Sequence, residues 1–242
     1  RSIYDSVISS VCKRHSFVYF IAGHGGTGKT FLWRAILARL RSQDHIVLVV
    51  ASSGVAALLM PGGRTAHSRF RIPLDIHDRS ICSIDRGTLL AALIQKTSLI
   101  IWDEAPMTHR FCFEALDRSL RDLLSADDAS NAAKPFGGLP ILLGGDFRQV
   151  LPVIQGADRT QILNASLIRS PLWKHVQVLR LTVNMRLCNP SLSPIEKARM
   201  SRFAQWVLDV GEGKIPAYRR DGEIEDTWIV VAVERTVLQT WR

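Results

Sequence analysis

GHGGTGKT, residues 23–30, is the stretch that decides the fold of this chain. An apolar run precedes it at residues 17–22, and a segment with apolar residues at helical spacing begins at Lys29. A buried strand, a glycine-rich turn and a helix in this order form a phosphate-binding loop. In such a loop the backbone N–H groups converge on an anion, and the following helix presents its positive N-terminal end. The stretch therefore predicts a site for a phosphorylated ligand.

The loop pattern is complete, because Gly23 and Gly28 have the required spacing and Lys29 and Thr30 follow directly. Lys29 is expected to reach the outer phosphates of a nucleoside triphosphate, and the Thr30 hydroxyl is a ligand for magnesium. A flexible turn is the alternative, and it explains the glycines but not Lys29 and Thr30. The candidate nucleotide-binding residues are Gly23, His24, Gly25, Gly26, Thr27, Gly28, Lys29 and Thr30.

Short apolar runs alternate along the chain with longer segments of helical period. The expected strands, apolar enough to be buried on both faces, are residues 17–22, 45–51, 97–103, 139–146 and 176–181. The expected helices are residues 29–42, 87–96, 110–124 and 195–210. In the third helix one face is expected to hold Phe113, Leu116, Leu120 and Leu123, and the other Asp117, Arg118, Arg121 and Asp122. This order predicts an α/β fold with a doubly wound, mostly parallel sheet and helices on both faces.

The charge balance favours an acidic partner. Lys and Arg number 31 against 22 Asp and Glu, which gives a formal net charge of +9. Such an excess suits a polyanion or an acidic membrane surface. No apolar run approaches the roughly 18 residues that a membrane span needs, so no span is expected. The cysteines lack metal or disulfide spacing, which indicates a reducing compartment; they are Cys12, Cys82, Cys112 and Cys188.

The domain organisation follows from where the regular pattern ends. Residues 1–210 are predicted to form one nucleotide-binding domain, and residues 211–242 an irregular tail or the start of a link to another domain. Residues 125–138 are expected to form a surface loop. The chain begins without an initiator Met or a signal pattern, so we expect it to be a piece of a longer protein whose targeting information lies elsewhere.

An acidic pair follows the third expected strand in LIIWDEAP, residues 99–106. The carboxyl ends of parallel strands meet at one edge of the sheet, so this pair is expected beside the phosphate loop. There Asp103 would hold magnesium, and Glu104 would orient or deprotonate the attacking water. A helix cap is the alternative for an apolar run that ends in Asp-Glu.

A second polar strand end lies in ILLGGDFRQVLPV, residues 141–153. It brings Asp146, Arg148 and Gln149 to the same edge of the sheet. Gln149 is expected to hydrogen-bond the terminal phosphate or its attacking water. An ordinary polar turn is the alternative.

Five segments in one order resemble the petite integration frequency (Pif-type) DNA helicases of superfamily one. They are GHGGTGKT, VASSGVAALLMPGGRTAHSRF, LIIWDEAPM, LGGDFRQVLPV and LTVNMR, and they are most similar to the helicase part of Helitron-like transposons. The resemblance extends from residue 3 to residue 228. Five ordered segments are far more specific than the phosphate loop alone.

The resemblance implies a RecA-like P-loop NTPase domain that hydrolyses ATP with Mg²⁺ while moving 5′ to 3′ along single-stranded DNA. Its implied roles are DNA replication, repair, recombination and telomere maintenance. By resemblance the catalytic residues are Lys29, Glu104, Gln149 and Arg186, and the metal ligands are Thr30 and Asp103. Arg186 is implied to approach the terminal phosphate, where an arginine neutralises transition-state charge. A surface ion pair is the alternative for Arg186.

The resemblance also implies a track for the DNA strand along residues 51–57 and 62–68. The candidate nucleic-acid contacts are Ser52, Ser53, Arg64, Thr65, His67 and Ser68. Hydroxyls, loop N–H groups and an arginine suit a phosphate backbone that is held without reading its sequence. Loop packing or solvation is the alternative for each, and for His67 a hydrogen-bonded place between two loops. Phe70 is a candidate for stacking on a base, with core packing as the alternative, and Trp33 and Trp102 are expected in the core.

The implied partners are single-stranded DNA, DNA duplex junctions and a second RecA-like domain in the full-length protein. We expect a monomer without a membrane partner. The expected location is the nucleus, and the mitochondrion is the alternative. One alternative is a truncated helicase-like module that binds DNA or a partner protein without unwinding. Another is a P-loop ATPase that acts on proteins, a class that lacks the segments 51–57 and 62–68.

Overall fold

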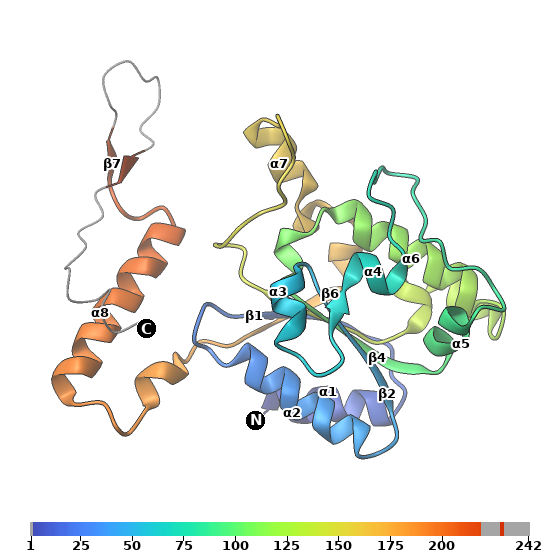
Figure 1. The fold of residues 1–242 in the computed structure, drawn as a ribbon, viewed down its shortest axis with the longest axis horizontal. Coiled ribbons are helices and arrows are strands. Elements are labelled where there is room, and N and C mark those ends of the chain that lie inside the picture. Colours follow the sequence, from blue (N-terminus) through green and yellow to red (C-terminus); the bar gives the residue numbers. More distant parts are fainter. Residues whose placement is uncertain (1, 219–227, 230–242) are drawn as a thin grey trace. The chain divides into compact units, whose positions relative to one another are not determined.

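The structure, a computed structural model, describes residues 2–218 and 228–229 (Figure 1). The chain divides into two compact units, Arg1–Asn189 and Pro190–Arg242. The expected domain boundary at residue 210 stays a prediction, and the expected tail at residues 211–242 lies in part outside the described residues. The helix α8, Pro194–Gly211, belongs to the second unit.

The first unit is built on a parallel sheet whose strand order is β3-β2-β4-β5-β1-β6. The strands are β1 Val18–Ala22, β2 Ile46–Ala51, β3 Arg64–Thr65, β4 Thr97–Asp103, β5 Ile141–Gly145 and β6 Val176–Arg180. Every strand that the sequence predicts is present, and the doubly wound α/β fold is confirmed. The expected burial of residues 176–181 on both faces is wrong, because β6 lies at the edge of the sheet and none of its residues is buried. The sequence did not predict β3, because a pair of polar residues carries no alternating pattern.

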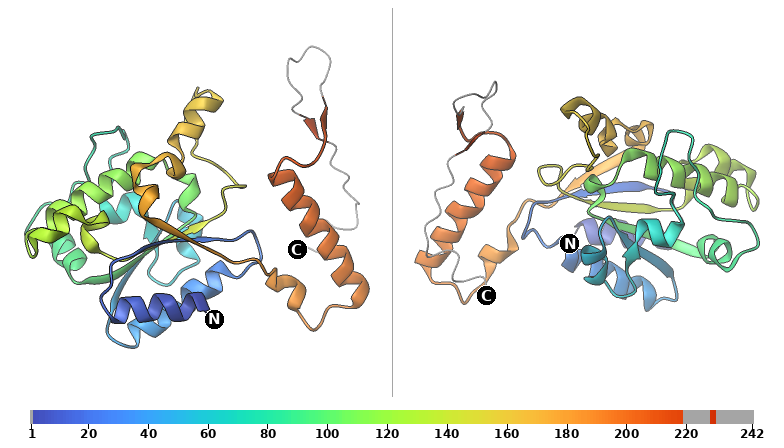
Figure 2. Two further views of the ribbon diagram at one scale, coloured as in Figure 1. Left: turned by 180° about the vertical axis from the view of Figure 1, so that it is seen from behind. Right: turned by 45° about the horizontal axis from the view of Figure 1, so that its top comes forward.

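Helices cover both faces of this sheet (Figures 1 and 2). One face packs against α1 Ser2–Cys12 and α2 Lys29–Arg41, and the other against α4 Ala66–Phe70, α5 Leu89–Gln95 and α6 Arg110–Leu124. The remaining α-helices of this unit are α3 Gly54–Leu58 and α7 Arg159–Ala165. Its 3-10 helices are η1 Ala105–Met107, η2 Ala129–Ala133, η3 Pro135–Gly138, η4 Leu167–Arg169, η5 Pro171–His175 and η6 Met185–Cys188.

The described residues of the second unit include α8 and a short antiparallel pair, β7 Ala217–Tyr218 with β8 Trp228–Ile229. Pro194 stands in the first turn of α8, and Ser193 and Glu196 form a reciprocal capping box before it. Proline fits this position because its missing N–H would have no partner in the first turn of a helix. Among the described residues, no helix is long and apolar enough to cross a membrane.

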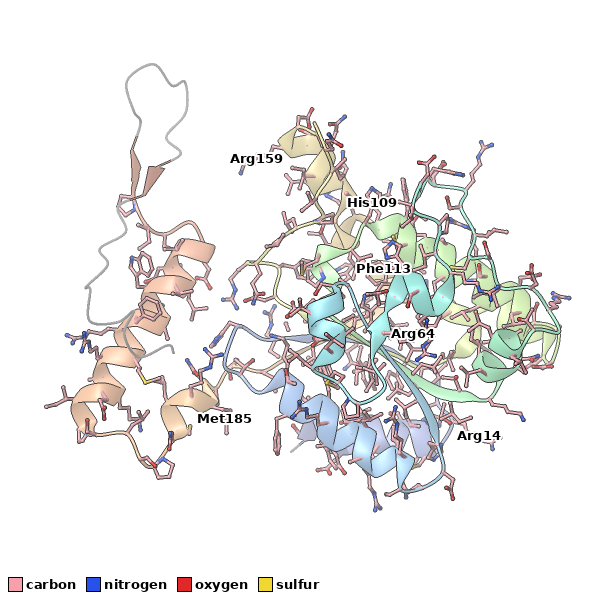
Figure 3. The ribbon with its side chains drawn as sticks, in the orientation of Figure 1. Arg14, Arg64, His109, Phe113, Arg159 and Met185 are labelled. Carbon is pink, nitrogen blue, oxygen red and sulfur yellow. The ribbon has the colours of Figure 1, made fainter. Side chains whose placement is uncertain are left out.

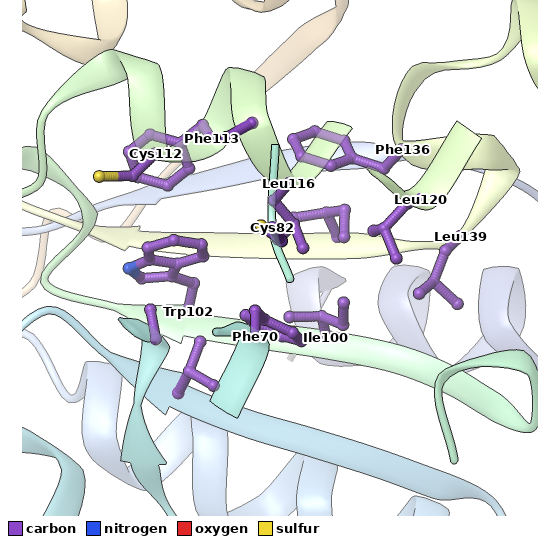
Figure 4. Packing of buried hydrophobic residues seen from close by; sticks show 14 of the residues in the cluster. Phe70, Cys82, Ile100, Trp102, Cys112, Phe113, Leu116, Leu120, Phe136 and Leu139 are labelled. Atoms are coloured by element: carbon purple, nitrogen blue, oxygen red, sulfur yellow. The ribbon is translucent and has the colours of Figure 1, made fainter. Parts of the chain in front are cut away.

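Aromatic side chains fill the core between the sheet and α6 (Figure 4). The Trp102 ring lies 4.3 Å from the Phe113 ring and 6.3 Å from the Phe70 ring, measured between centroids. Phe70 is 0% exposed, which corrects its candidacy for stacking on a base: it is a core residue. Trp33 and Trp102 are buried in the core, as the sequence predicts.

One face of α6 differs from the prediction. Asp117 was expected on the solvent side, but it is buried. Its carboxylate accepts hydrogen bonds from the Phe136 backbone N–H at 2.5 Å and from Arg121 Nε at 2.8 Å. A buried carboxylate needs such partners, and Phe136 lies in the connection that leads to β5. Asp117 therefore ties that connection to α6.

The helix that carries Lys29 and Thr30 approaches the sheet closely at Gly144. A Cβ at Gly144 would lie 2.3 Å from Trp33 Cζ2, so β5 leaves room for the indole only because this position has no side chain. The Trp33 side chain is fully buried there. This contact fixes α2 against β5, and with it the end of the phosphate loop.

Replacing Gly144 by alanine tests this packing. Since the added methyl group would overlap Trp33, we expect the free energy of unfolding to fall by about 1–3 kcal/mol, as for other overpacked cores. Urea denaturation measures it. Gly54→Ala is the matched control, because its Cβ would meet nothing within 4 Å and alanine favours a helix. Equal stability of Gly144→Ala and the unaltered chain would contradict the packing argument.

Candidate nucleotide-binding and hydrolysis site

The phosphate loop connects β1 to α2 and adopts a backbone that suits glycine. Gly26 and Gly28 both have φ of +87°, a region that residues with a side chain enter at a cost. Lys29 is the first residue of α2, and its Nζ donates a hydrogen bond to the Gly23 carbonyl at 2.5 Å. The lysine ammonium group therefore lies back over the first residue of the loop.

Backbone N–H groups of the loop are available to an anion. Among the described residues, the N–H groups of Gly25, Gly26 and Gly28 donate no hydrogen bond. The first N–H groups of α2 have no partner within the helix. The surroundings of Gly25 are open, since a Cβ there would meet nothing within 4 Å. These N–H groups, the helix N-terminus and Lys29 fit the phosphates of a nucleotide.

The acidic pair lies at the carboxyl end of β4. Asp103 is the last residue of the strand and is 5% exposed, and its Oδ1 accepts a hydrogen bond from the Glu104 N–H at 3.1 Å. Glu104 has φ 52° and ψ 39°, a left-handed conformation that is uncommon outside glycine. The surrounding structure must therefore hold Glu104 in a conformation that costs free energy.

The charges around Glu104 come from all three predicted motifs. Burial raises the pKa of the Glu104 carboxyl, and the neighbouring Asp103 raises it further. Lys29 lowers this pKa and Asp146 raises it. The structure thus brings the phosphate loop, the acidic pair and the end of β5 together, as the sequence predicts.

The end of β5 supplies one group that the sequence analysis left without a role. Asp146 is 8% exposed, and its Oδ1 accepts hydrogen bonds from the Arg148 N–H at 3.2 Å and from Arg148 Nε at 2.9 Å. Asp146 therefore orients Arg148 and adds negative charge near Glu104. Gln149 is exposed just beyond this turn, and its N–H donates to the Asp146 carbonyl at 3.1 Å.

The segment after β6 returns to the phosphate loop. The Met185 N–H donates to the Gly26 carbonyl at 2.9 Å, and a Cβ at Gly26 would lie 2.7 Å from Asn184 Oδ1 and 3.2 Å from Arg186 Cδ. Arg186 therefore stands beside the phosphate loop, and its approach to a terminal phosphate stays a prediction. Asn184 was missed by the sequence analysis, although its side chain orients Arg186 by accepting from the Arg186 N–H at 3.1 Å.

The two segments expected to contact DNA end at the same edge of the sheet. β2 and β3 are parallel neighbours in which Ala51 pairs with Thr65. Ser53 and Thr65 cap α3 and α4, accepting hydrogen bonds from the N–H groups of Ala56 and Ser68. The structure therefore places the candidate segments side by side and gives these hydroxyls a capping role.

The other candidate contacts differ in their surroundings. Arg64 and Ser68 are exposed, and Figure 3 labels Arg64 beside α4. His67 is half-buried; burial lowers its pKa, and its Nε2 lies 3.8 Å from Cys112 Sγ. The Ser52 hydroxyl is engaged inside the protein with Trp102, Glu104 and Thr108. Ser52 therefore faces the hydrolysis site as well as the expected track.

A cleft of about 450 Å³ lies apart from the phosphate loop, between the start of α6 and α7. Its lining includes His109, Arg110, Phe111, Gln161 and Asn164. None of the residues around Glu104 lines it. The cleft is therefore separate from the candidate nucleotide site at the phosphate loop and strand ends.

Comparison with known families agrees with this geometry. The model of the family described as PIF1-like helicase matches residues 1–221. The chain belongs to the PIF1-like helicase family. The resemblance of its five ordered segments to Pif-type helicases is thereby confirmed.

Curated relatives of this PIF1-like chain share about a third of the aligned residues. The ATP-dependent DNA helicase PIF1 of Trypanosoma brucei brucei is 31% identical over 212 residues, which cover 88% of this chain and 19% of the relative. The ATP-dependent DNA helicase RRM3 of Saccharomyces cerevisiae is 28% identical over 214 residues, covering 86% of this chain and 28% of the relative. The chain thus spans less than a third of the length of these relatives.

Solved structures show the same fold. Pif1 helicase from Bacteroides in complex with ADP-AlF3 and ssDNA superposes with a TM-score of 0.67 at 22% identity, covering 89% of this chain and 47% of that one. Pif1 helicase from Candida albicans gives a TM-score of 0.62 at 24% identity, covering 88% of this chain and 44% of that one. The PIF1-like chain therefore shares the fold of these proteins over less than half of their length.

The charges around Glu104 predict how its carboxyl titrates without divalent cations. Lys29→Met removes a positive charge that favours the ionised form, so the Glu104 pKa should rise. Asp146→Asn removes a negative charge, so that pKa should fall. Carboxyl carbon NMR across a pH series measures both shifts. Arg14→Met is the control and should leave the Glu104 pKa unchanged, since Arg14 precedes β1 at the opposite edge of the sheet (Figure 3). Shifts of the Glu104 pKa with the same sign in both site variants would contradict the assignment.

Proposed function

We propose that the chain is the first motor domain of an ATP-dependent DNA helicase, in which ATP hydrolysis drives 5′ to 3′ movement along single-stranded DNA and unwinding at duplex junctions. The observation that carries this proposal is the meeting of Lys29, Glu104 and Asp146 beside a loop with unpaired N–H groups. Family membership supports it, because the relatives are named ATP-dependent DNA helicases.

The proposed hydrolysis assigns one task to each group. The loop N–H groups and Lys29 hold the phosphates, and Glu104 accepts the proton of the attacking water. Gln149 hydrogen-bonds that water or the terminal phosphate, and Arg186 neutralises the charge that develops there. Thr30 and Asp103 would hold Mg²⁺, which supplies positive charge to the phosphate oxygens. The fit rests on the oxygen ligands of these residues and the open, N–H-lined loop.

The proposed DNA track runs over the loops that follow β2 and β3. It uses the exposed Arg64 with the small hydroxyl side chains of Ser53, Thr65 and Ser68, while His67 lines the track from its half-buried place. Such groups bind phosphates and sugars without reading bases. The net charge of +9 supports a polyanionic partner.

We place this chain in a longer motor. Residues 1–210 act as the first RecA-like domain, and residues 211–242 lead toward a second RecA-like domain that closes on ATP. A monomer located in the nucleus, or in mitochondria, fits this role. Hydrolysis coupled to stepping needs both domains, because the nucleotide must bridge them.

ATP turnover by the natural full-length protein tests the proposal. We expect single-stranded oligo(dT) to stimulate turnover. Glu104→Gln should lower kcat by roughly 10²–10⁴-fold with nucleotide affinity retained, because only the proton acceptor is lost. Lys29→Ala should lower nucleotide affinity as well. A coupled phosphate-release assay and nucleotide titration measure these quantities. Turnover that DNA never stimulates would contradict the helicase assignment, and unchanged kcat in Glu104→Gln would contradict the role of Glu104.

A further inference from the structure

The Ser52 hydroxyl has a complete set of partners inside the protein. Its O–H donates to the Glu104 carbonyl at 2.6 Å, and its oxygen accepts from Trp102 Nε1 at 3.2 Å and from Thr108 Oγ1 at 2.6 Å. A serine hydroxyl has one hydrogen to donate and room for two hydrogen bonds from donors. Ser52 therefore cannot bind a DNA phosphate through this hydroxyl without giving up one of these bonds.

Ser52 holds the backbone of the acidic pair at two points. Its N–H donates to the Asp103 carbonyl at 3.2 Å, while its side chain holds the carbonyl of Glu104. Of the acidic pair, Glu104 has the left-handed backbone conformation, which costs free energy. The hydrogen bond to its carbonyl holds the peptide group that follows it in place. The direction of the Glu104 carboxylate depends on that backbone conformation.

Ser52 also belongs to the segment that the proposed DNA strand would contact. It directly follows β2 and precedes Ser53, the N-cap of α3. Val55 and Leu58 on α3 are 78% and 85% exposed, so this helix offers its surface to a partner. Because Ser52 connects β2 to α3 and is hydrogen-bonded to the Glu104 carbonyl, a movement of α3 relative to β2 would change the position of the Glu104 backbone.

We propose that Ser52 is a positioning residue that couples occupancy of the DNA track to the orientation of Glu104. This inference rests on the proposed function, since it concerns the DNA stimulation of ATP hydrolysis. It assigns Ser52 a role distinct from a direct DNA contact. Thr108 and Trp102 complete the link by fixing the direction in which the Ser52 hydroxyl points.

Ser52→Ala in the natural full-length protein tests the coupling. We expect kcat at saturating oligo(dT) to fall about tenfold, while KM for ATP and Kd for oligo(dT) change less than twofold, because neither ligand loses a contact. Ser52→Thr keeps the hydroxyl and should restore most of the stimulation. Ser98→Ala is the matched control, since Ser98 at the start of β4 is another half-buried serine, and its hydroxyl hydrogen-bonds the ring of His45. It should leave stimulation unchanged.

The outcomes separate the inference from the proposed function. Full stimulation in Ser52→Ala, with the unaltered protein stimulated by DNA, would overturn the coupling alone. A weaker Kd for oligo(dT) with an unchanged saturated kcat would make Ser52 a DNA contact and also overturn it. An unaltered protein that DNA does not stimulate would overturn the proposed function.

The indole resonance of Trp102 gives a second readout that does not depend on turnover. In the ¹⁵N spectrum of the chain, Ser52→Ala should shift the Trp102 N–H signal and leave the other indole signals in place, which also shows that the variant is folded. Addition of oligo(dT) should shift the same signal in the unaltered chain. A Trp102 signal that oligo(dT) shifts equally in Ser52→Ala would contradict the link through the hydroxyl.

Discussion

The parallel pairing of β4, β5 and β1 is the constraint on which the site depends. β5 pairs with β1 through Ala22 and Gly145 and with β4 through Trp102 and Leu143, so the three strands end at one edge. Each strand is followed by a chemically distinct segment: the phosphate loop, the acidic pair and the turn at Asp146. No residue of these segments needs to reach far, because the sheet has already brought their ends together.

The conformation and charge environment of Glu104 cost free energy, which hydrogen bonds and an opposite charge nearby offset. A left-handed Glu104 costs about 1–3 kcal/mol, and a half-buried carboxylate near Asp103 and Asp146 adds electrostatic repulsion. The Ser52 hydrogen bonds return about 1 kcal/mol each in a partly buried setting. Lys29 supplies the opposing charge. A site of this kind gives up stability for a carboxylate that points in one direction.

The sequence predicts local patterns of this molecule well and distant contacts poorly. The phosphate loop and the strand ends follow from residues close together in the chain, and the structure brings them together as predicted. Asp117 is buried because it hydrogen-bonds Phe136, and Phe70 is buried because it packs on Trp102. The partners in each pair lie far apart in the sequence, so no residue spacing predicts their contact. The resemblance makes Ser52 a candidate DNA contact, and no residue spacing reveals that its hydroxyl hydrogen-bonds Glu104 and Thr108, which lie at the end of another strand. The strand β3 has only two residues, too few to show an alternation of apolar and polar residues in the sequence.

The central claim is that these strand ends form one nucleotide site. Amide hydrogen exchange of the chain, with and without Mg²⁺ and a non-hydrolysable ATP analogue, tests it most directly. We predict that the nucleotide slows exchange at residues 23–31, 103–107 and 146–149 together, and leaves the cleft residues 154–165 unchanged. Slowed exchange confined to residues 154–165, or no change at residues 23–31, would contradict the account.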